Sequence, residues 1–185
     1  IHLYDRRTVF EDDRTWCAFR TEPHIFESCV SKRWRRVAVR ADGRVAEARL
    51  EAHPYEHIAA KDFYAEALRQ LHGSPLVQLH LGVDVLEATG GGVVFRQDGE
   101  IQRHDHRLVY DSRPPTIPKS GLAQCFAGVV VRTKEPRFDP ERAILMDFDV
   151  ASDLDLERDD GHASRNLRFR YVLPFSAHEA LIEDT

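Results

Sequence analysis

The sequence predicts an α/β fold in two lobes, of which the second is mostly antiparallel β-sheet. In the first part of the chain, strand-like runs alternate with one amphipathic helical pattern, whereas in the last part strand follows strand. The pattern changes near Arg113-Pro114-Pro115, where proline restricts the residue before it to extended conformations. We therefore divide the chain into residues 1–118 and 119–185.

The first lobe begins with a buried strand over Ile1–Asp5, which ends on an acidic residue. Further on, Asp42-Gly43 separates two strand-like runs and favours a tight hairpin turn, because both residues can take positive φ. We expect this hairpin, near residues 37–51, to be inserted in the first lobe. An amphipathic helix is predicted over Ile58–Leu71 from apolar residues at four-residue spacing, and Gly73 ends it.

The remaining strands follow from alternating or continuous apolar runs bounded by turn residues. In the first lobe we expect strands over residues 76–81, 93–96, 100–103 and 108–110, with a second Asp-Gly turn at Asp98-Gly99. In the second lobe we expect strands over residues 126–132, 143–150, 167–173 and 180–183, and a charged loop over 152–165. Phe169 and Tyr171 share one strand face, which is therefore apolar and aromatic.

Composition limits the function. The 185 residues are 42% apolar and 31% charged, which suits a globular domain. The formal net charge is −5, so we expect no nucleic-acid partner. No apolar run is long enough to span a bilayer and no signal-like start is present, which favours a cytoplasmic location. The first residue is Ile1 and the single methionine is Met146, so we expect an internal piece of a longer protein.

No metal site is predicted. The three cysteines, Cys17, Cys29 and Cys125, have no C-x-x-C spacing, and buried free thiols are the simpler interpretation. His104 and His106 flank Asp105, but the sequence indicates no third ligand.

Three segments of the first lobe have alternative interpretations. Asp5 lies where a dinucleotide-binding βαβ unit places its ribose-binding acid, or it is an ordinary aspartate at a strand end. The run from Arg14 to Cys17 combines a cation, a hydroxyl and an indole in a loop, or its Trp16 closes the edge of the core. Basic residues around Trp34, namely Lys32, Arg33, Arg35 and Arg36, fit an anionic membrane face or a solvated turn.

Glu183-Asp184 ends the last strand. Paired acids beside an apolar sheet face can provide a general acid with a raised pKa, and an ordinary solvated strand end is the alternative.

Several separated strings together resemble the bacterial, FAD-associated lycopene β-cyclases, in the same order and at similar spacing. These strings are Asp13-Arg14-Thr15-Trp16-Cys17, Tyr110-Asp111-Ser112-Arg113, Leu145-Met146-Asp147-Phe148, Tyr171-Val172-Leu173-Pro174-Phe175-Ser176 and Ala180-Leu181-Ile182-Glu183-Asp184-Thr185. The resemblance covers nearly the whole chain and is weakest between residues 23 and 57.

The resemblance implies a Rossmann-type FAD-binding lobe, incomplete here, and a β-sheet substrate lobe, as in group A flavoproteins. It implies that Glu183 and Asp184 are the catalytic acidic pair, with Glu183 as the acid. The residues it assigns to the flavin are Asp5, Arg14, Trp16 and Asp111.

The implied activity is that of an intramolecular lyase or isomerase, which cyclises the ends of lycopene to β-ionone rings without net redox change. The implied cofactors are reduced FAD and NAD(P)H as its reductant. Because the substrate resides in lipid, we expect peripheral association with the inner face of the membrane. The alternatives are a flavin-dependent prenyl or carotenoid reductase, a monooxygenase of the same fold, and a non-catalytic carotenoid-binding relative.

Overall fold

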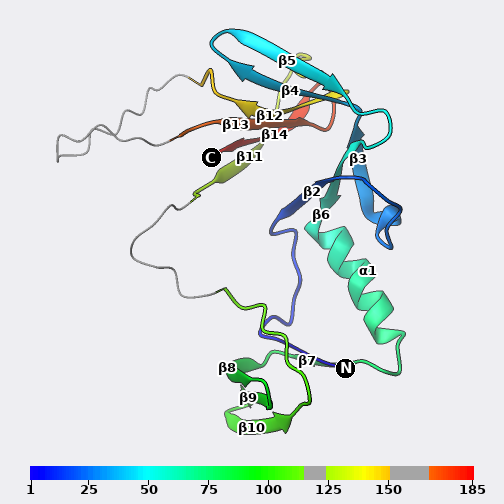
Figure 1. The fold of residues 1–185 in the computed structure, drawn as a ribbon, viewed down its shortest axis with the longest axis vertical. Coiled ribbons are helices and arrows are strands. Elements are labelled where there is room, and N and C mark those ends of the chain that lie inside the picture. Colours follow the sequence, from blue (N-terminus) through cyan, green and yellow to red (C-terminus); the bar gives the residue numbers. More distant parts are fainter. Residues whose placement is uncertain (115–123, 151–166) are drawn as a thin grey trace, which may run out of the picture. The chain divides into compact units, whose positions relative to one another are not determined.

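The computed structural model describes residues 1–114, 124–150 and 167–185 (Figure 1). It divides into two compact units, each formed by two stretches of chain. Unit 1 comprises Ile1–Thr15 and Ala59–Gly121, and unit 2 comprises Trp16–Ile58 and Leu122–Thr185. Most regular structure in the described residues is β-strand, with one α-helix, α1 (Ala60–His72), and a short 3-10 helix, η1 (Glu27–Cys29).

Unit 1 contains two small sheets. Strand β1 (His2–Asp5) pairs in parallel with β7 (Gln78–Leu81). Strands β8 (Asp84–Thr89), β9 (Gly92–Gln97) and β10 (Glu100–Asp105) form an antiparallel sheet. Its core consists of the buried side chains of Val83, Val93 and Phe95, against which Tyr4 packs.

Unit 2 is built from two further sheets (Figure 1). The smaller has the strand order β2 (Thr15–Phe19), β6 (Tyr55–Ala59), β3 (Val30–Trp34). The larger has six strands, in the order β11 (Ala127–Arg132), β14 (Glu179–Asp184), β13 (Arg170–Pro174), β12 (Arg142–Asp147), β4 (Arg36–Ala41), β5 (Arg44–Arg49). The buried core of unit 2 is formed by Trp34, Val37, Ala143 and Leu173.

The local predictions are largely confirmed. Both Asp-Gly hairpins form, β4 with β5 and β9 with β10, and Asp42 and Asp98 have the positive φ that such turns require. The helix and the strands expected in the last part of the chain lie within a few residues of their predicted bounds. Residues 108–110 form no strand. The charged loop expected over 152–165 lies outside the described residues.

The α/β prediction holds in part, because strands dominate and the parallel β1–β7 pair is the α/β element of unit 1. The structure also divides the chain differently from the sequence-based division. Residues 16–58 belong to unit 2, because β4 pairs in parallel with β12 and so joins the hairpin at residues 36–49 to the six-stranded sheet.

Both interpretations of the basic stretch are wrong for Trp34. Trp34 is completely buried in the core and its indole Nε1 donates a hydrogen bond to the Pro174 carbonyl at 2.8 Å. Arg33 pairs with Glu56 and Glu27, and Arg36 pairs with Asp139. Trp34 therefore belongs to the core of unit 2, whereas Arg33 and Arg36 stay partly exposed in their ion pairs.

Candidate active site

Glu183 and Asp184 lie next to each other on β14 but face opposite sides of the sheet, because successive side chains of a strand alternate. Glu183 lies directly opposite Tyr171 of β13, and Asp184 lies opposite Arg170. On the other side of β14, Glu183 pairs with Gly128 of β11. The two carboxylates therefore have entirely different neighbours.

Asp184 is held by two arginines. Arg170 Nε donates to Asp184 Oδ1 at 2.8 Å, and Arg168 Nη2 donates to Oδ2 at 3.2 Å. These hydrogen bonds, of which that from Arg170 is the stronger, lower the pKa of Asp184. Asp184 is therefore ionised at neutral pH.

Glu183 is affected in the opposite direction. Its half-buried carboxyl loses water contacts, and this desolvation raises its pKa. No basic side chain among the described residues forms an ion pair with it. Two adjacent acids with pKa values shifted in opposite directions can serve different roles, one as a proton donor and the other as a permanent charge.

Two partly buried polar side chains, Cys17 and Tyr55, interact with Glu183 electrostatically. Burial raises the pKa of the Cys17 thiol to about 12, with the charge of Glu183 adding to the increase. The Tyr55 hydroxyl forms a hydrogen bond with the Cys17 thiol, and the pKa of Tyr55 is raised chiefly by burial. Both side chains pack on the core of unit 2, and their raised pKa values keep both neutral at neutral pH.

The aromatic face predicted from the sequence is present. Phe169 pairs with Thr185, and its ring centroid lies 5.3 Å from that of Tyr171. The ring centroid of Phe148 lies 5.6 Å from that of Phe169. Phe169, Tyr171 and Glu183 therefore share one face of the sheet, whereas Arg168 and Arg170 contact Asp184 on the other.

Sequence reasoning identified the acidic pair but not its surroundings. Tyr55 lies on β6, far from Glu183 in sequence, and no local pattern marks it as a neighbour. Cys17 ends the run from Arg14 to Cys17, in which the cation and the indole are the chemically conspicuous groups. Gly128 gave no signal, because its role depends on the pairing of β11 with β14.

The residues expected to contact a flavin have separate partners in the structure. Asp5, at the carboxyl end of β1, accepts hydrogen bonds from Arg7 Nη2 at 2.8 Å and from the Arg7 backbone N–H at 2.8 Å. The hydrogen bond from the Arg7 side chain is the main reason why the pKa of Asp5 is lowered. An ionised carboxylate at this strand end can accept hydrogen bonds from ribose hydroxyls, so Asp5 fits that part of a dinucleotide.

Asp111 is paired with Arg113, whose hydrogen bonds lower the pKa of Asp111 to about 2. Arg113 also donates to the Val85 carbonyl at 2.7 Å, which anchors the segment after β10. Arg14 pairs with Asp13, and both are exposed.

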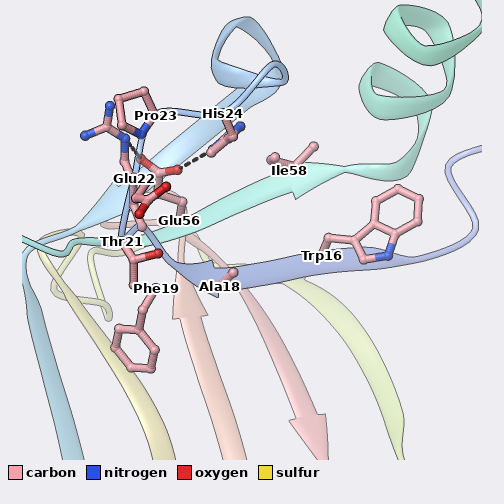
Figure 2. A pocket seen from close by; sticks show the side chains of 10 residues that line it. Trp16, Ala18, Phe19, Thr21, Glu22, Pro23, His24, Glu56 and Ile58 are labelled. Atoms are coloured by element: carbon pink, nitrogen blue, oxygen red, sulfur yellow. Dashed lines mark hydrogen bonds and ion pairs between the residues drawn. The ribbon is translucent and has the colours of Figure 1, made fainter.

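Trp16 lines a pocket of about 320 Å³ in unit 2 (Figure 2). Figure 2 shows Glu56 and His24 joined at its wall, where His24 Nε2 lies 3.1 Å from Glu56 Oε2. Glu183 does not line this pocket, and the carboxylate of Glu56 is already paired with Arg33 at 2.6 Å. We therefore place the candidate chemistry at Glu183 and not in this pocket. The pocket is lined by Trp16, Ala18, Phe19, Arg20, Thr21, Glu22, Pro23, His24, Glu56 and Ile58.

Comparison with known families identifies the chain. The model of the family described as lycopene cyclase protein matches residues 5–185. The chain belongs to the lycopene cyclase protein family. The match includes Glu183, Asp184 and the four residues expected to contact a flavin. A search of curated proteins finds no relative of significant similarity to this lycopene cyclase family member.

Solved structures share its fold. A geranylgeranyl bacteriochlorophyll reductase-like protein from Thermoplasma acidophilum aligns with a TM-score of 0.62 at 12% identity, over 97% of this chain and 48% of that one. A mutant of 2-methyl-3-hydroxypyridine-5-carboxylic acid oxygenase aligns with a TM-score of 0.61 at 8% identity, over 99% and 51%. The lycopene cyclase family chain thus spans about half the length of these proteins. Within the residues described, no helix is both long enough and apolar enough to cross a membrane.

Proposed function

We propose that this chain forms part of a lycopene β-cyclase in which Glu183 is the general acid. The observation that carries the proposal is the opposite environment of two adjacent carboxyls, with Glu183 desolvated and Asp184 bound by Arg170 and Arg168. A raised pKa keeps a carboxylic acid protonated nearer to neutral pH, as proton donation requires.

The reaction needs one proton at the start and releases one at the end. Glu183 donates its proton to the terminal alkene carbon of lycopene, which leaves a tertiary carbocation. The neighbouring double bond then attacks the cation and closes a six-membered ring. A proton leaves the new ring, so the atoms of the product equal those of the substrate and no electrons are transferred.

The surroundings of Glu183 suit this substrate. Lycopene has no polar group, so its site must be long and apolar. The face that carries Phe169 and Tyr171 is a candidate wall, and aromatic ring faces attract a passing cation. The neutral Cys17 and Tyr55 add no competing base close to Glu183.

In this proposal Asp184 acts through Glu183. Its charge is compensated by two arginines on the opposite face of the sheet, so it does not touch the substrate. Its ion pairs with Arg170 and Arg168 fix the end of β14 against β13 and thereby position Glu183. Asp184 is thus a positioning residue.

The flavin-binding part of the proposal rests on the family and on Asp5, which stays ionised at the end of a parallel strand. Asp5 would hold the ribose hydroxyls, and Arg14, Trp16 and Asp111 are the other residues proposed to face the cofactor. When bound and reduced, with NAD(P)H as reductant, FAD would supply negative charge that stabilises the cation. The substrate also implies peripheral association of a cytoplasmic protein with the inner membrane face.

The test compares Glu183→Gln with Glu179→Gln in the full natural protein. Glu179 lies on the same strand but pairs with the exposed Arg132, so its variant is a matched control. Conversion of lycopene to carotene is measured with chemically pre-reduced flavin. We expect Glu183→Gln to lower turnover by at least about 10²–10⁴-fold, because the amide cannot donate the acid proton. Near-normal turnover of Glu183→Gln would remove Glu183 from the mechanism.

Product mass separates the proposal from its main rival. The similarity in fold to a reductase-like protein favours a flavin-dependent reductase as the second candidate. Cyclisation leaves the product mass equal to that of lycopene, whereas reduction increases it by added hydrogen and oxygenation by added oxygen. A heavier product would overturn the cyclase proposal, and the absence of any product would favour a non-catalytic carotenoid-binding protein.

A further inference from the structure

Unit 1 gathers four histidines around one tyrosine. In the parallel β1–β7 pair, Tyr4 lies opposite His80, and His2 projects from the same side of β1 as Tyr4. His104 comes from β10, and His106 follows the end of that strand. Their rings are packed together, with centroids 4.6 Å apart for Tyr4 and His80 and 5.2 Å for His80 and His104.

Gly92 allows this approach. A Cβ built at Gly92 would lie only 2.5 Å from the backbone oxygen of His104 and 3.2 Å from Asp105. Any larger residue at this position would push the end of β10 away from β9. The position of His104 in the histidine cluster therefore depends on a close contact between β9 and β10 that only glycine at position 92 permits.

Three of these histidines have the spacing of metal ligands. One ring nitrogen from each of His2, His80 and His104 lies within 4.8 Å of the other two. His2 Nδ1 and His80 Nε2 are 2.9 Å apart. Nitrogens bound tetrahedrally to zinc at about 2.0 Å lie about 3.3 Å from each other. The His2–His80 pair needs only a small rotation of the rings to reach that separation, with the ion replacing the proton that the two nitrogens now share.

Tyr4 supplies the outer contact that such sites usually contain. Its hydroxyl lies 2.7 Å from His104 Nδ1 and 2.8 Å from His106 Nε2. Because one hydroxyl can accept from one imidazole and donate to the other, Tyr4 fixes the orientation of both rings. In metal sites, a hydrogen bond to the second nitrogen of a ligating histidine has this same function.

We propose that His2, His80 and His104 form a site for a divalent transition-metal ion of the zinc class, with Tyr4 as the orienting residue and water in the fourth position. Imidazole nitrogens select zinc and its neighbours over magnesium and calcium, which prefer oxygen ligands. The sequence predicted no metal site because His104 and His106 showed no third ligand. The pairing of β1 with β7 brings two more histidines to them.

The site is tested by zinc titration of the full natural protein after removal of metal with a chelator. Calorimetry with zinc chloride should show one ion bound per chain. His80→Ala and His104→Ala should each weaken zinc binding by about 100-fold or more, and Tyr4→Phe by about 10-fold, as expected for an outer-shell partner. His72→Ala removes an exposed histidine from the end of α1 and should leave the affinity unchanged.

Two results would overturn the proposal. The first is the absence of saturable zinc binding, and the second is equal affinity in the wild type, His80→Ala and His104→Ala. Circular dichroism establishes that each variant is folded. If an alanine variant unfolds, cobalt(II) binding by the unchanged protein decides: strong visible absorption bands of tetrahedral cobalt support the site, and the spectrum of aqueous cobalt overturns it.

Discussion

Gly128 lies directly across the β11–β14 ladder from Glu183, and a Cβ built on Gly128 would lie 3.5 Å from Glu183 Oε2. The same Cβ would lie 3.2 Å from Leu181 Cδ1. The missing side chain thus leaves one side of the Glu183 carboxyl open to water. This open side limits how far burial raises the pKa of Glu183.

Gly128→Ala should close this side and raise the pKa of Glu183 further. A general acid acts in its protonated form, so activity is lost as pH rises through its pKa, and a higher pKa moves that loss to higher pH. The measurement is the pH profile of kcat/KM for lycopene conversion. Val129→Ala, at a neighbouring exposed position, is the control and should leave the profile in place. An unchanged profile in Gly128→Ala would contradict the prediction.

Glu183 should also make stability depend on pH. Its pKa is raised in the folded state above the ordinary value of 4.5, so the folded state binds the proton more tightly. The free energy of unfolding must therefore fall as pH rises from about that value through the raised pKa. Glu183→Gln removes this decrease, which urea unfolding at a series of pH values will detect. A decrease of the same size in the variant would show that another group titrates.

Asp184 should make stability depend on pH in the opposite direction, and Asp184→Asn should remove that dependence. The pKa of Asp184 is lowered from 3.8, so its stabilisation is present above that value and is lost as pH falls through the lowered pKa. Because Asp184 is more than one third exposed, solvent screens its ion pairs and we expect a loss of about 1 kcal/mol or less at pH 7. Turnover should fall less than in Glu183→Gln. A larger fall in turnover would transfer the acid role to Asp184.

Trp34→Phe should destabilise unit 2 by about 2 kcal/mol, since it removes buried surface and leaves the Pro174 carbonyl without its hydrogen bond. Urea unfolding measures the loss. Phe126→Ala, at an exposed position, should change the stability by less than about 0.5 kcal/mol. Binding of folded Trp34→Phe to vesicles of anionic lipid should equal that of the wild type. Weaker vesicle binding by folded Trp34→Phe than by the wild type would indicate that Trp34 does contact the membrane.

Glu56→Gln should destabilise the protein by about 1–3 kcal/mol, because it removes the charge of a buried carboxylate and leaves its partners Arg33 and His24 with a weaker contact. Burial alone would raise the pKa of Glu56, but hydrogen bonds from Arg33 and His24 outweigh it and the pKa is lowered. The wild type should therefore lose stability on acidification, and Glu56→Gln should lose less. Glu22→Gln, at an exposed position in the same pocket lining, is the control.

The sequence predicted those features that depend on neighbouring residues. The turns at Asp42-Gly43 and Asp98-Gly99 and the helix ending at Gly73 are determined by backbone preferences over a few positions. The location of Trp34 could not be predicted in this way. Its burial depends on Pro174, far away in sequence, and the local charge around it is typical of an exposed turn.

The candidate site shows the same limit. The opposite orientation of Glu183 and Asp184 follows from the alternation of side chains along a strand, which depends on neighbouring residues alone. The pKa of Glu183 depends on how deeply its face of the sheet is buried. Tyr55, which interacts electrostatically with Glu183, belongs to a different sheet. The histidine cluster likewise appears only when His2 and His80 are brought together by the β1–β7 pairing.

The parallel pairing of β4 with β12 has a consequence for biosynthesis. Val37 pairs with Ala143, so β4 has no partner on that edge until the ribosome has made all the intervening residues, including the second stretch of unit 1, Ala59–Gly121. An unpaired strand edge of a nascent chain is a template for association with other chains. Pairing across such a sequence separation also slows folding. Chaperone demand and inclusion-body formation during expression should therefore respond to changes in β4 more than to changes in β9 or β10, which find their partners within a few residues.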